Sequence, residues 1–490
     1  MITEGKAMIG NFYSKASKAF GAQIANCYRT VKGSFTPEQF GVFLNMHSTE
    51  ITENYLVSFH EIYHHWQSIF TPYGHLKWRF YRSFSSEVID LWLKATGEIP
   101  SMRIIPVGSM LPCKSLKQLN CIKQIFIQDL ARRVIALEER LSFDPIIQNI
   151  LPISMDDICP TVCFLGIEYR MSGIDILESF AKFQEASLAY LVEGKAFAET
   201  VDICKLRPEY YSAMAYFIER AGPDRILEFP ILCEIALTTD ELCQFDRKTT
   251  WQKHHPAWRF VKMVDIISTY NSMEHLEVPN IKERFNEYAE KLLQQCSFTR
   301  LEHCWDSAIA HASQDNLNIP KDMLRAIAFK KQYPWALSFP FLDMDIFMQI
   351  KEFHPYYYIT TDLTSYIVSS VTLGNEVAFE NHFQALAHQI CGNMSQRCLD
   401  RTKIQCSFSY YGLKECQYQK DGSCDGHIDH DSKLPKVKID AAENIIEGCA
   451  FEAFLDLMGI KVQELNITNI ATKIDIEALS ENVKAIKGIS

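Results

Sequence analysis

Residues 60–64 place two histidines one helical turn apart, with a glutamate after the first of them, in the pattern H-E-x-x-H. An α-helix turns about 100° per residue, so side chains four positions apart lie within roughly 40° of each other. On a helix, His60 and His64 can therefore bind one zinc ion through their ring nitrogens. Zinc lowers the pKa of a bound water to about 7, and a neighbouring glutamate takes its proton as general base. The pattern predicts a zinc site with Glu61 as the catalytic residue.

The surrounding sequence predicts the helix that this site needs. Residues 53–70 contain neither proline nor glycine, and apolar or aromatic residues recur with a helical period. Ser48 or Thr52 is expected to cap the helix, and the turn-forming residues 71–74 are expected to end it. The recurring positions are Tyr55, Leu56, Phe59, Ile62, Tyr63, Trp66 and Phe70.

A catalytic zinc needs a third protein ligand and an open position for water. Residues 191–196 follow a leucine-rich segment and have the pattern L-x-E-G-x-A. An H-E-x-x-H helix followed by this pattern resembles the glutamate-zincin metallopeptidases, the group that includes the zinc aminopeptidases. The resemblance implies that Glu193 is the third zinc ligand beside His60 and His64, and that Glu61 is the base.

Other glutamates compete with Glu193 for this role. Glu447 begins a second E-G-x-A run near the C-terminus, and the sequence leaves open which of the two completes the site. Glu193 is preferred because it lies nearer to the histidines in the sequence. Weaker candidates are Glu87, Glu185 and Glu199.

Two other interpretations of the motif stay open. Glu61 and His64 also form the E-x-x-H pair of a di-iron carboxylate oxidoreductase, although that architecture needs a second such pair and the sequence contains none. The second alternative is that the chain is a non-enzymatic helical interaction protein with a degenerate or structural metal site. For a peptidase, Tyr169 and His65 are the candidates that donate a hydrogen bond to the oxyanion.

The C-terminal third contains a second group of residues whose types are able to bind metals. Cysteine and histidine are the usual ligands of structural zinc, but these cysteines have irregular spacing and no C-x-x-C pair. Reduced thiols are therefore the simpler interpretation, and a second metal is the alternative. The cysteines are Cys391, Cys398, Cys406, Cys416 and Cys424.

The composition limits the class of partner and the compartment. The 490 residues include 49 Lys and Arg against 60 Asp and Glu, a net charge of −11, and no long basic run. Nucleic-acid and membrane-surface binding both need clustered basic residues, so neither is expected. We find no signal peptide and no apolar stretch of about 18 residues. The 16 cysteines are then most simply reduced thiols of a cytoplasmic protein.

Sparse glycine and proline favour long helices, so we expect a mainly α fold with a small β-sheet (α+β) and a zincin-like catalytic domain. We expect a catalytic region at 1–205, a helical region at 206–345 and a cysteine-rich C-terminal region at 346–490 that regulates the site or recognises substrate. Residues 35–47 are β-prone, either as a core strand or as an edge strand that pairs with substrate. The resulting hypothesis is a zinc metallopeptidase that cleaves selected intracellular proteins or peptides.

Overall fold

The fold is described from a computed structural model of the whole chain. The chain divides into two compact units, and each is discontinuous in the sequence. The first comprises Met1–Ser58, Tyr81–Asn120 and Pro355–Asn482, and the second comprises Phe59–Phe80, Cys121–His354 and Val483–Ser490. Residues described in the structure are 9–10, 33–36, 41–44, 54–96, 103–106, 148, 153–195, 207–240, 248–269, 280–313, 318–355, 357–360, 363–367, 419–420, 423–424, 438–439, 445–447 and 460–463.

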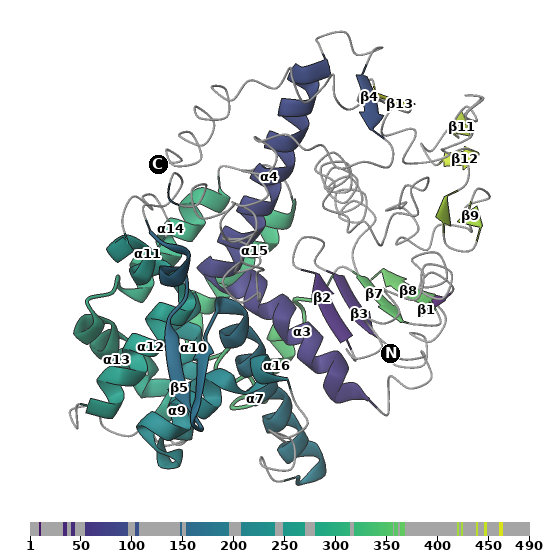
Figure 1. Cartoon of the computed structure of the whole chain (residues 1–490). Helices are drawn as coiled ribbons and strands as arrows, with labels where there is room; N and C mark the ends of the chain where they lie inside the picture. Colours follow the sequence, from purple (N-terminus) through teal and green to yellow (C-terminus); the bar gives the residue numbers. More distant parts are fainter. Residues whose placement is uncertain are drawn as a thin grey trace. The chain divides into compact units, whose positions relative to one another are not determined.

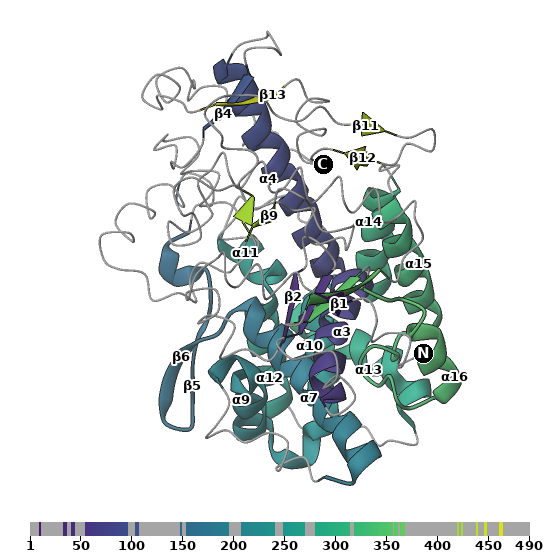
Figure 2. The same ribbon diagram turned by 90° about the vertical axis from the view of Figure 1, so that its right-hand side faces the viewer.

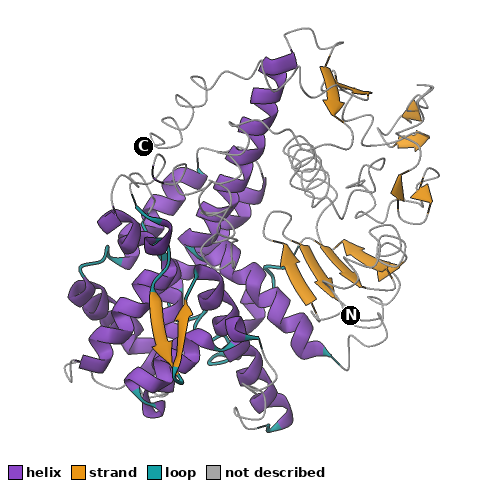
Figure 3. Ribbon diagram, in the orientation of Figure 1, coloured by secondary structure: helices purple, strands orange, loops and turns teal. Residues whose placement is uncertain are grey.

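The described residues are mostly helical and carry small β-sheets, as the sequence predicts (Figure 3). The units are interleaved along the chain, whereas the sequence led us to expect three consecutive regions. None of the helices among the described residues is both long and apolar enough to cross a membrane. Residues 116–141, whose sequence pattern is helical, and most of the segment from Cys391 to Cys424 lie outside the described residues.

The motif helix is α3, Tyr55–Phe70, which lies within the predicted 53–70. One face is aromatic, and the side chains of Phe59, Tyr63, Trp66 and Phe70 are all buried. Burial of each contributes roughly 2 kcal/mol or more, which offsets the cost of placing polar residues on the opposite face of the same helix. The chain turns at Thr71 and continues directly into α4, Pro72–Thr96.

The second site-bearing helix is α7, Gly173–Glu193. It begins where the Asp175 carboxylate accepts hydrogen bonds from the backbone N–H of Ser172 at 2.7 Å and from its hydroxyl at 2.6 Å. It ends at Gly194, whose φ of 66° is the left-handed conformation that glycine adopts without strain. The sequence pattern of residues 175–204 predicts a longer helix, but Gly194 ends it after Glu193.

Helices α9, α10 and α12 pack against α7 in the second unit (Figure 1). The short hairpin of β5, Thr161–Phe164, and β6, Ile167–Arg170, packs against α9 and leads into α7 (Figure 2). The other elements of this unit are η5 (Met155–Asp157), η6 (Pro208–Tyr210), α9 (Ser212–Ala221), η7 (Pro223–Glu228), α10 (Phe229–Leu237), α11 (Lys248–His254), α12 (Pro256–Thr269), α13 (Ile281–Cys296), α14 (Leu301–Ala312), α15 (Asn318–Gln332) and α16 (Met344–Ile350).

A buried turn at residues 334–338 connects α3 and α7 to the rest of this unit. The hydroxyl of Tyr63 on α3 donates to the backbone oxygen of Leu337 at 2.7 Å. The amide of Gln184 on α7 donates to the backbone oxygen of Ser338 at 2.8 Å. Because buried carbonyls need hydrogen-bond partners, each of these contacts satisfies a polar group of the turn.

The first unit contains a five-stranded sheet with the order β1-β8-β7-β3-β2. Strand β3 pairs in parallel with β7 and antiparallel with β2, and its Val42 and Leu44 are buried. Within the segment 35–47, residues 41–44 therefore form a core strand, as one of the two alternatives expected, whereas residues 35–36 belong to β2, the last strand in the order of this sheet. The strands of this sheet are β1 (Ile9–Gly10), β2 (Gly33–Thr36), β3 (Gly41–Leu44), β7 (Tyr357–Thr360) and β8 (Leu363–Ile367).

The remaining strands of the first unit form three two-stranded sheets, β4–β13, β9–β10 and β11–β12. Glu447 lies in β12, Ile445–Glu447, so the second E-G-x-A run begins at the end of a strand, whereas the first begins at the end of a helix. The other strands are β4 (Arg103–Pro106), β9 (Gln419–Lys420), β10 (Ser423–Cys424), β11 (Lys438–Ile439) and β13 (Ile460–Gln463).

Candidate metal centre

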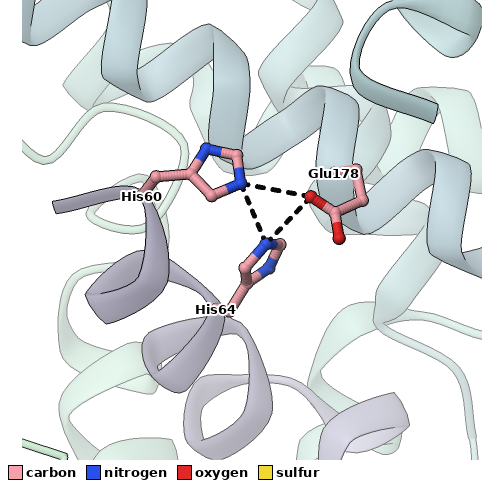
Figure 4. Close-up of side chains that lie close together, drawn as sticks. All are labelled: His60, His64 and Glu178. Carbon is pink, nitrogen blue, oxygen red and sulfur yellow. Dashed lines mark hydrogen bonds and ion pairs between the residues drawn. The ribbon is translucent and has the colours of Figure 1, made fainter. Parts of the chain in front are cut away.

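Two histidines from α3 and one glutamate from α7 converge on a common point, as Figure 4 shows. The Nε2 atoms of His60 and His64 are 3.1 Å apart. One carboxylate oxygen of Glu178, Oε2, lies 3.1 Å from the first of these nitrogens and 3.2 Å from the second. The three atoms therefore form a nearly equilateral triangle of electron-pair donors.

The structure places Glu178, and not Glu193, beside the histidines. Glu193 is the last residue of α7, is solvent-exposed, and forms an ion pair with Lys195. A helix rises about 1.5 Å per residue, so the two glutamates are roughly 22 Å apart along the helix axis. Glu447 belongs to the other unit, and Glu199 lies outside the described residues. Glu87 is on α4, and its side chain is not described.

Each histidine is oriented by a contact at its other ring nitrogen. Nδ1 of His60 lies 3.1 Å from Oε2 of Glu185, and Lys182 donates to the other oxygen of that carboxylate at 2.6 Å. Nδ1 of His64 lies 2.7 Å from Oε1 of Gln67. In metal sites the ligating histidine commonly donates its second N–H to such an acceptor, which leaves the opposite nitrogen to bind the metal.

This donor set fits a zinc ion. In a tetrahedral zinc site with bonds of about 2.0–2.1 Å, two ligand atoms lie roughly 3.3–3.4 Å apart. The observed separations of 3.1, 3.1 and 3.2 Å are close to that range. Two imidazoles and one carboxylate are the ligands of many catalytic zinc sites, and they also serve as the ligands of iron(II) in oxygenases.

The charges of the site favour a cation between the three donor atoms. Burial opposes protonation of His60, but its hydrogen bonds to Glu178 and Glu185 outweigh burial and raise its pKa from 6.5 to about 10. Burial also opposes ionisation of Glu178, yet the charge of His64 and the hydrogen bonds from both histidines hold the pKa of this carboxyl well below its ordinary range. Glu178 is therefore a carboxylate, the form that binds metals.

Glu61 lies in α3 next to His60 and is 4% exposed. Burial raises the pKa of Glu61 from 4.5 to about 7, and the nearby His60 and His64 oppose this rise. A carboxyl group with a pKa near neutrality both accepts and releases protons readily, which is the property of a general base. The structure thus brings the predicted residues His60, Glu61 and His64 together.

Tyr210 in η6 is a neighbour of the site that sequence patterns do not mark. Its ring centroid lies 5.6 Å from that of His60. Burial raises the pKa of Tyr210 above its ordinary value of 10, and the charges of Glu178 and Glu61 add to the effect. The phenol therefore stays protonated at neutral pH and is able to donate a hydrogen bond.

The two oxyanion donors expected from the sequence lie in other contacts. The hydroxyl of Tyr169 donates to Asp175 at 2.6 Å, at the start of α7. His65 is fully buried, and burial together with the charge of His354 lowers its pKa to about 3. His65 is rotated by about 100° around the helix from His64, so its side chain lies in the buried core and not beside the donor atoms.

A signal for Glu178 exists in the sequence. Glu178 and Glu185 are seven residues apart, which on a helix is roughly two turns and places them on one face. Two carboxylates on one face of a helix that is otherwise largely buried need partners, and here the partners are the histidines. The terminal E-G-x-A pattern instead marks the end of this helix.

Comparison with protein-family models, with curated proteins and with solved structures finds no match to this chain. Its function must therefore be inferred from the chemistry of the site.

Proposed function

We propose that this protein is a zinc-dependent peptidase in which His60, His64 and Glu178 hold the metal and Glu61 is the general base. The observation that carries the proposal is the convergence of two Nε2 atoms and one carboxylate oxygen at separations of 3.1–3.2 Å, with Glu61 buried beside them. When bound, zinc polarises a carbonyl oxygen and lowers the pKa of a coordinated water to about 7.

The residues have distinct tasks in this reaction. The carboxylate of Glu61 accepts a proton from the attacking water and passes it to the nitrogen of the leaving amine. The hydroxyl of Tyr210 donates a hydrogen bond to the carbonyl oxygen as negative charge develops on it. Glu185 holds His60 through Nδ1, so that its Nε2 faces Glu178. The substrate class is a protein or peptide.

The placement of the ligands on two helices agrees with the resemblance to the glutamate-zincins. In that group the H-E-x-x-H helix supplies two histidines and a second helix supplies a glutamate. Here α3 carries His60 and His64, while Glu178 on α7 takes the role expected for Glu193. We therefore infer a zincin-like catalytic domain built around α3 and α7.

The alternative functions account for fewer of these features. A purely structural zinc is held by four protein ligands, whereas the cluster among the described residues has three, which leaves a position for water. A di-iron site needs a second E-x-x-H pair and further carboxylates. Mononuclear iron(II) oxygenases use the same three ligands, but their chemistry gives no task to the buried Glu61.

Removal of the metal tests the proposal. The purified protein is expected to hydrolyse members of a quenched-fluorescence peptide library, to lose this activity when incubated with 1,10-phenanthroline, and to regain it when one equivalent of zinc is added. Iron(II) added anaerobically is the control for the competing metal. Hydrolysis that persists in the metal-free protein, or restoration by iron(II) alone, contradicts the proposed function.

Tyr210→Phe tests the oxyanion donor. Loss of one such donor is expected to lower kcat by roughly 10²-fold, with little change in KM or in zinc content, because the hydrogen bond strengthens only as charge develops. Tyr169→Phe is the matched control, since its hydroxyl bonds to Asp175 and not to the site. Equal loss of kcat in both variants, or a full rate in Tyr210→Phe, excludes Tyr210 from this role.

A further inference from the structure

Gln67 is a buried amide that contacts both helices of the site. It lies three residues after His64 on α3 and is 1% exposed. Its Oε1 is 2.7 Å from Nδ1 of His64, and its Nε2 donates to the backbone oxygen of Leu177 at 3.0 Å. Leu177 immediately precedes Glu178 on α7. One side chain therefore joins a histidine of the candidate metal centre to the backbone beside its glutamate.

The chemistry of these contacts determines which nitrogen of His64 carries the proton. A backbone carbonyl can only accept a hydrogen bond, so the NH₂ group of Gln67 must face Leu177. Its carbonyl oxygen must then face His64, and Nδ1 of that ring must donate to it. The lone pair of the neutral ring is then on Nε2, the atom that lies 3.2 Å from Glu178.

We propose that Gln67 is a positioning residue for the metal centre. It holds His64 in the tautomer that binds metal through Nε2, and through the Leu177 carbonyl it keeps the Glu178 carboxylate 3.2 Å from that nitrogen. This inference rests on the proposed function, because it assumes a metal between the two histidines and Glu178. The motif of this protein is accordingly H-E-x-x-H-x-x-Q, with the glutamine on the same face as both histidines.

The same contact couples metal binding to the pairing of α3 with α7. His60 and His64 come from one helix and Glu178 from the other, so the three donors meet only when the helices are held together. Gln67 supplies a hydrogen bond between the helices at the level of the site. Residues that orient metal ligands in this way typically change metal affinity by about 10- to 100-fold when they are replaced.

The test measures zinc affinity in matched variants of the full chain. Gln67→Met keeps the size of the side chain and removes both contacts. Gln67→Glu keeps an acceptor for His64 but loses the donor to the Leu177 backbone oxygen. Gln184→Met is the control, because Gln184 is equally buried on α7 but donates to Ser338, a contact in which no candidate ligand takes part. Zinc dissociation constants are measured by competition with a chromophoric chelator, and the geometry of the site is followed by the visible absorption of bound Co²⁺.

We expect Gln67→Met to bind zinc about 10- to 100-fold more weakly and to change the Co²⁺ spectrum, Gln67→Glu to lose less affinity than Gln67→Met, and Gln184→Met to stay within about threefold of the wild type. Should Gln67→Met fail to fold, Gln67→Asn replaces it, since the shorter amide cannot reach both contacts. Unchanged zinc affinity in Gln67→Met or Gln67→Asn overturns the inference, as does an equal loss in Gln184→Met. If the wild type itself binds no zinc, the proposed function fails instead.

Discussion

Glu61→Gln is expected to lower kcat on the order of 10³-fold while the protein keeps its zinc. Glutamine has nearly the same shape as glutamate but accepts no proton at neutral pH, so the variant isolates proton transfer from packing. Glu61 is buried, and burial raises its pKa to about 7, so the neutral amide replaces a group that is already partly protonated at neutral pH. The fold should therefore tolerate the change.

Two measurements on Glu61→Gln separate its role as a base from a role in the structure. Zinc content and thermal unfolding temperature should match those of the wild type, and only the rate of peptide hydrolysis should fall. Glu228→Gln is a control at another buried glutamate, which forms an ion pair with Arg225 and is not part of the donor triangle. A Glu61→Gln variant that holds zinc and cleaves at the wild-type rate removes Glu61 as the general base.

Glu178→Ala is expected to weaken zinc binding by on the order of 10²–10³-fold. Zinc sites in small domains bind with about 10–16 kcal/mol in total, so one ligand of three or four accounts for roughly 3–5 kcal/mol. The matched variant is Glu193→Ala, the same substitution on the same helix. Its side chain is exposed and paired with Lys195, so zinc binding should be unchanged.

This pair of variants decides between the ligand expected from the sequence pattern and the ligand placed by the structure. Zinc affinities are compared under identical conditions, with circular dichroism to show that both variants are folded. Loss of zinc in Glu193→Ala with retention in Glu178→Ala would contradict the arrangement described above. Loss in Glu178→Ala alone supports it.

The local part of the site could be predicted from the sequence. Two histidines four residues apart lie on the same face of any helix, and the apolar period of residues 53–70 predicts that helix. Glu61 is on the flank of that face for the same reason. The observed α3, Tyr55–Phe70, confirms the helix and presents His60 and His64 together.

The partner of these histidines could not be read from local periodicity. The part of α7 that faces α3 is decided by tertiary contacts between the two helices, such as the ring of Tyr63 against the ring of Phe180 at 5.2 Å between centroids. These contacts place the middle of α7 beside the histidines, where Glu178 lies, and leave Glu193 exposed at its end. Tyr210 reaches the site for a similar reason, because η6 packs against α7.

In the five-stranded sheet, too, the sequence predicts the local structure but not the distant contacts. Residues 41–44 have the composition of a strand, and they form β3. Its partner on one side, β7, begins at Tyr357, more than 300 residues further along the chain. Whether a strand lies at an edge or in the interior of a sheet depends on such distant pairing. The sequence therefore left open whether residues 41–44 have a free edge, and in the structure β3 has a strand on both sides.

The proposed chemistry depends on one zinc ion held by His60, His64 and Glu178. Diffraction from crystals of the protein purified without chelator, with data collected on both sides of the zinc absorption edge, tests this binding. We predict one anomalous peak, within about 2.0–2.2 Å of the two Nε2 atoms and one carboxylate oxygen of Glu178. A peak elsewhere, a metal bound by Glu193 or Glu447 in place of Glu178, or no peak at this site would contradict the account.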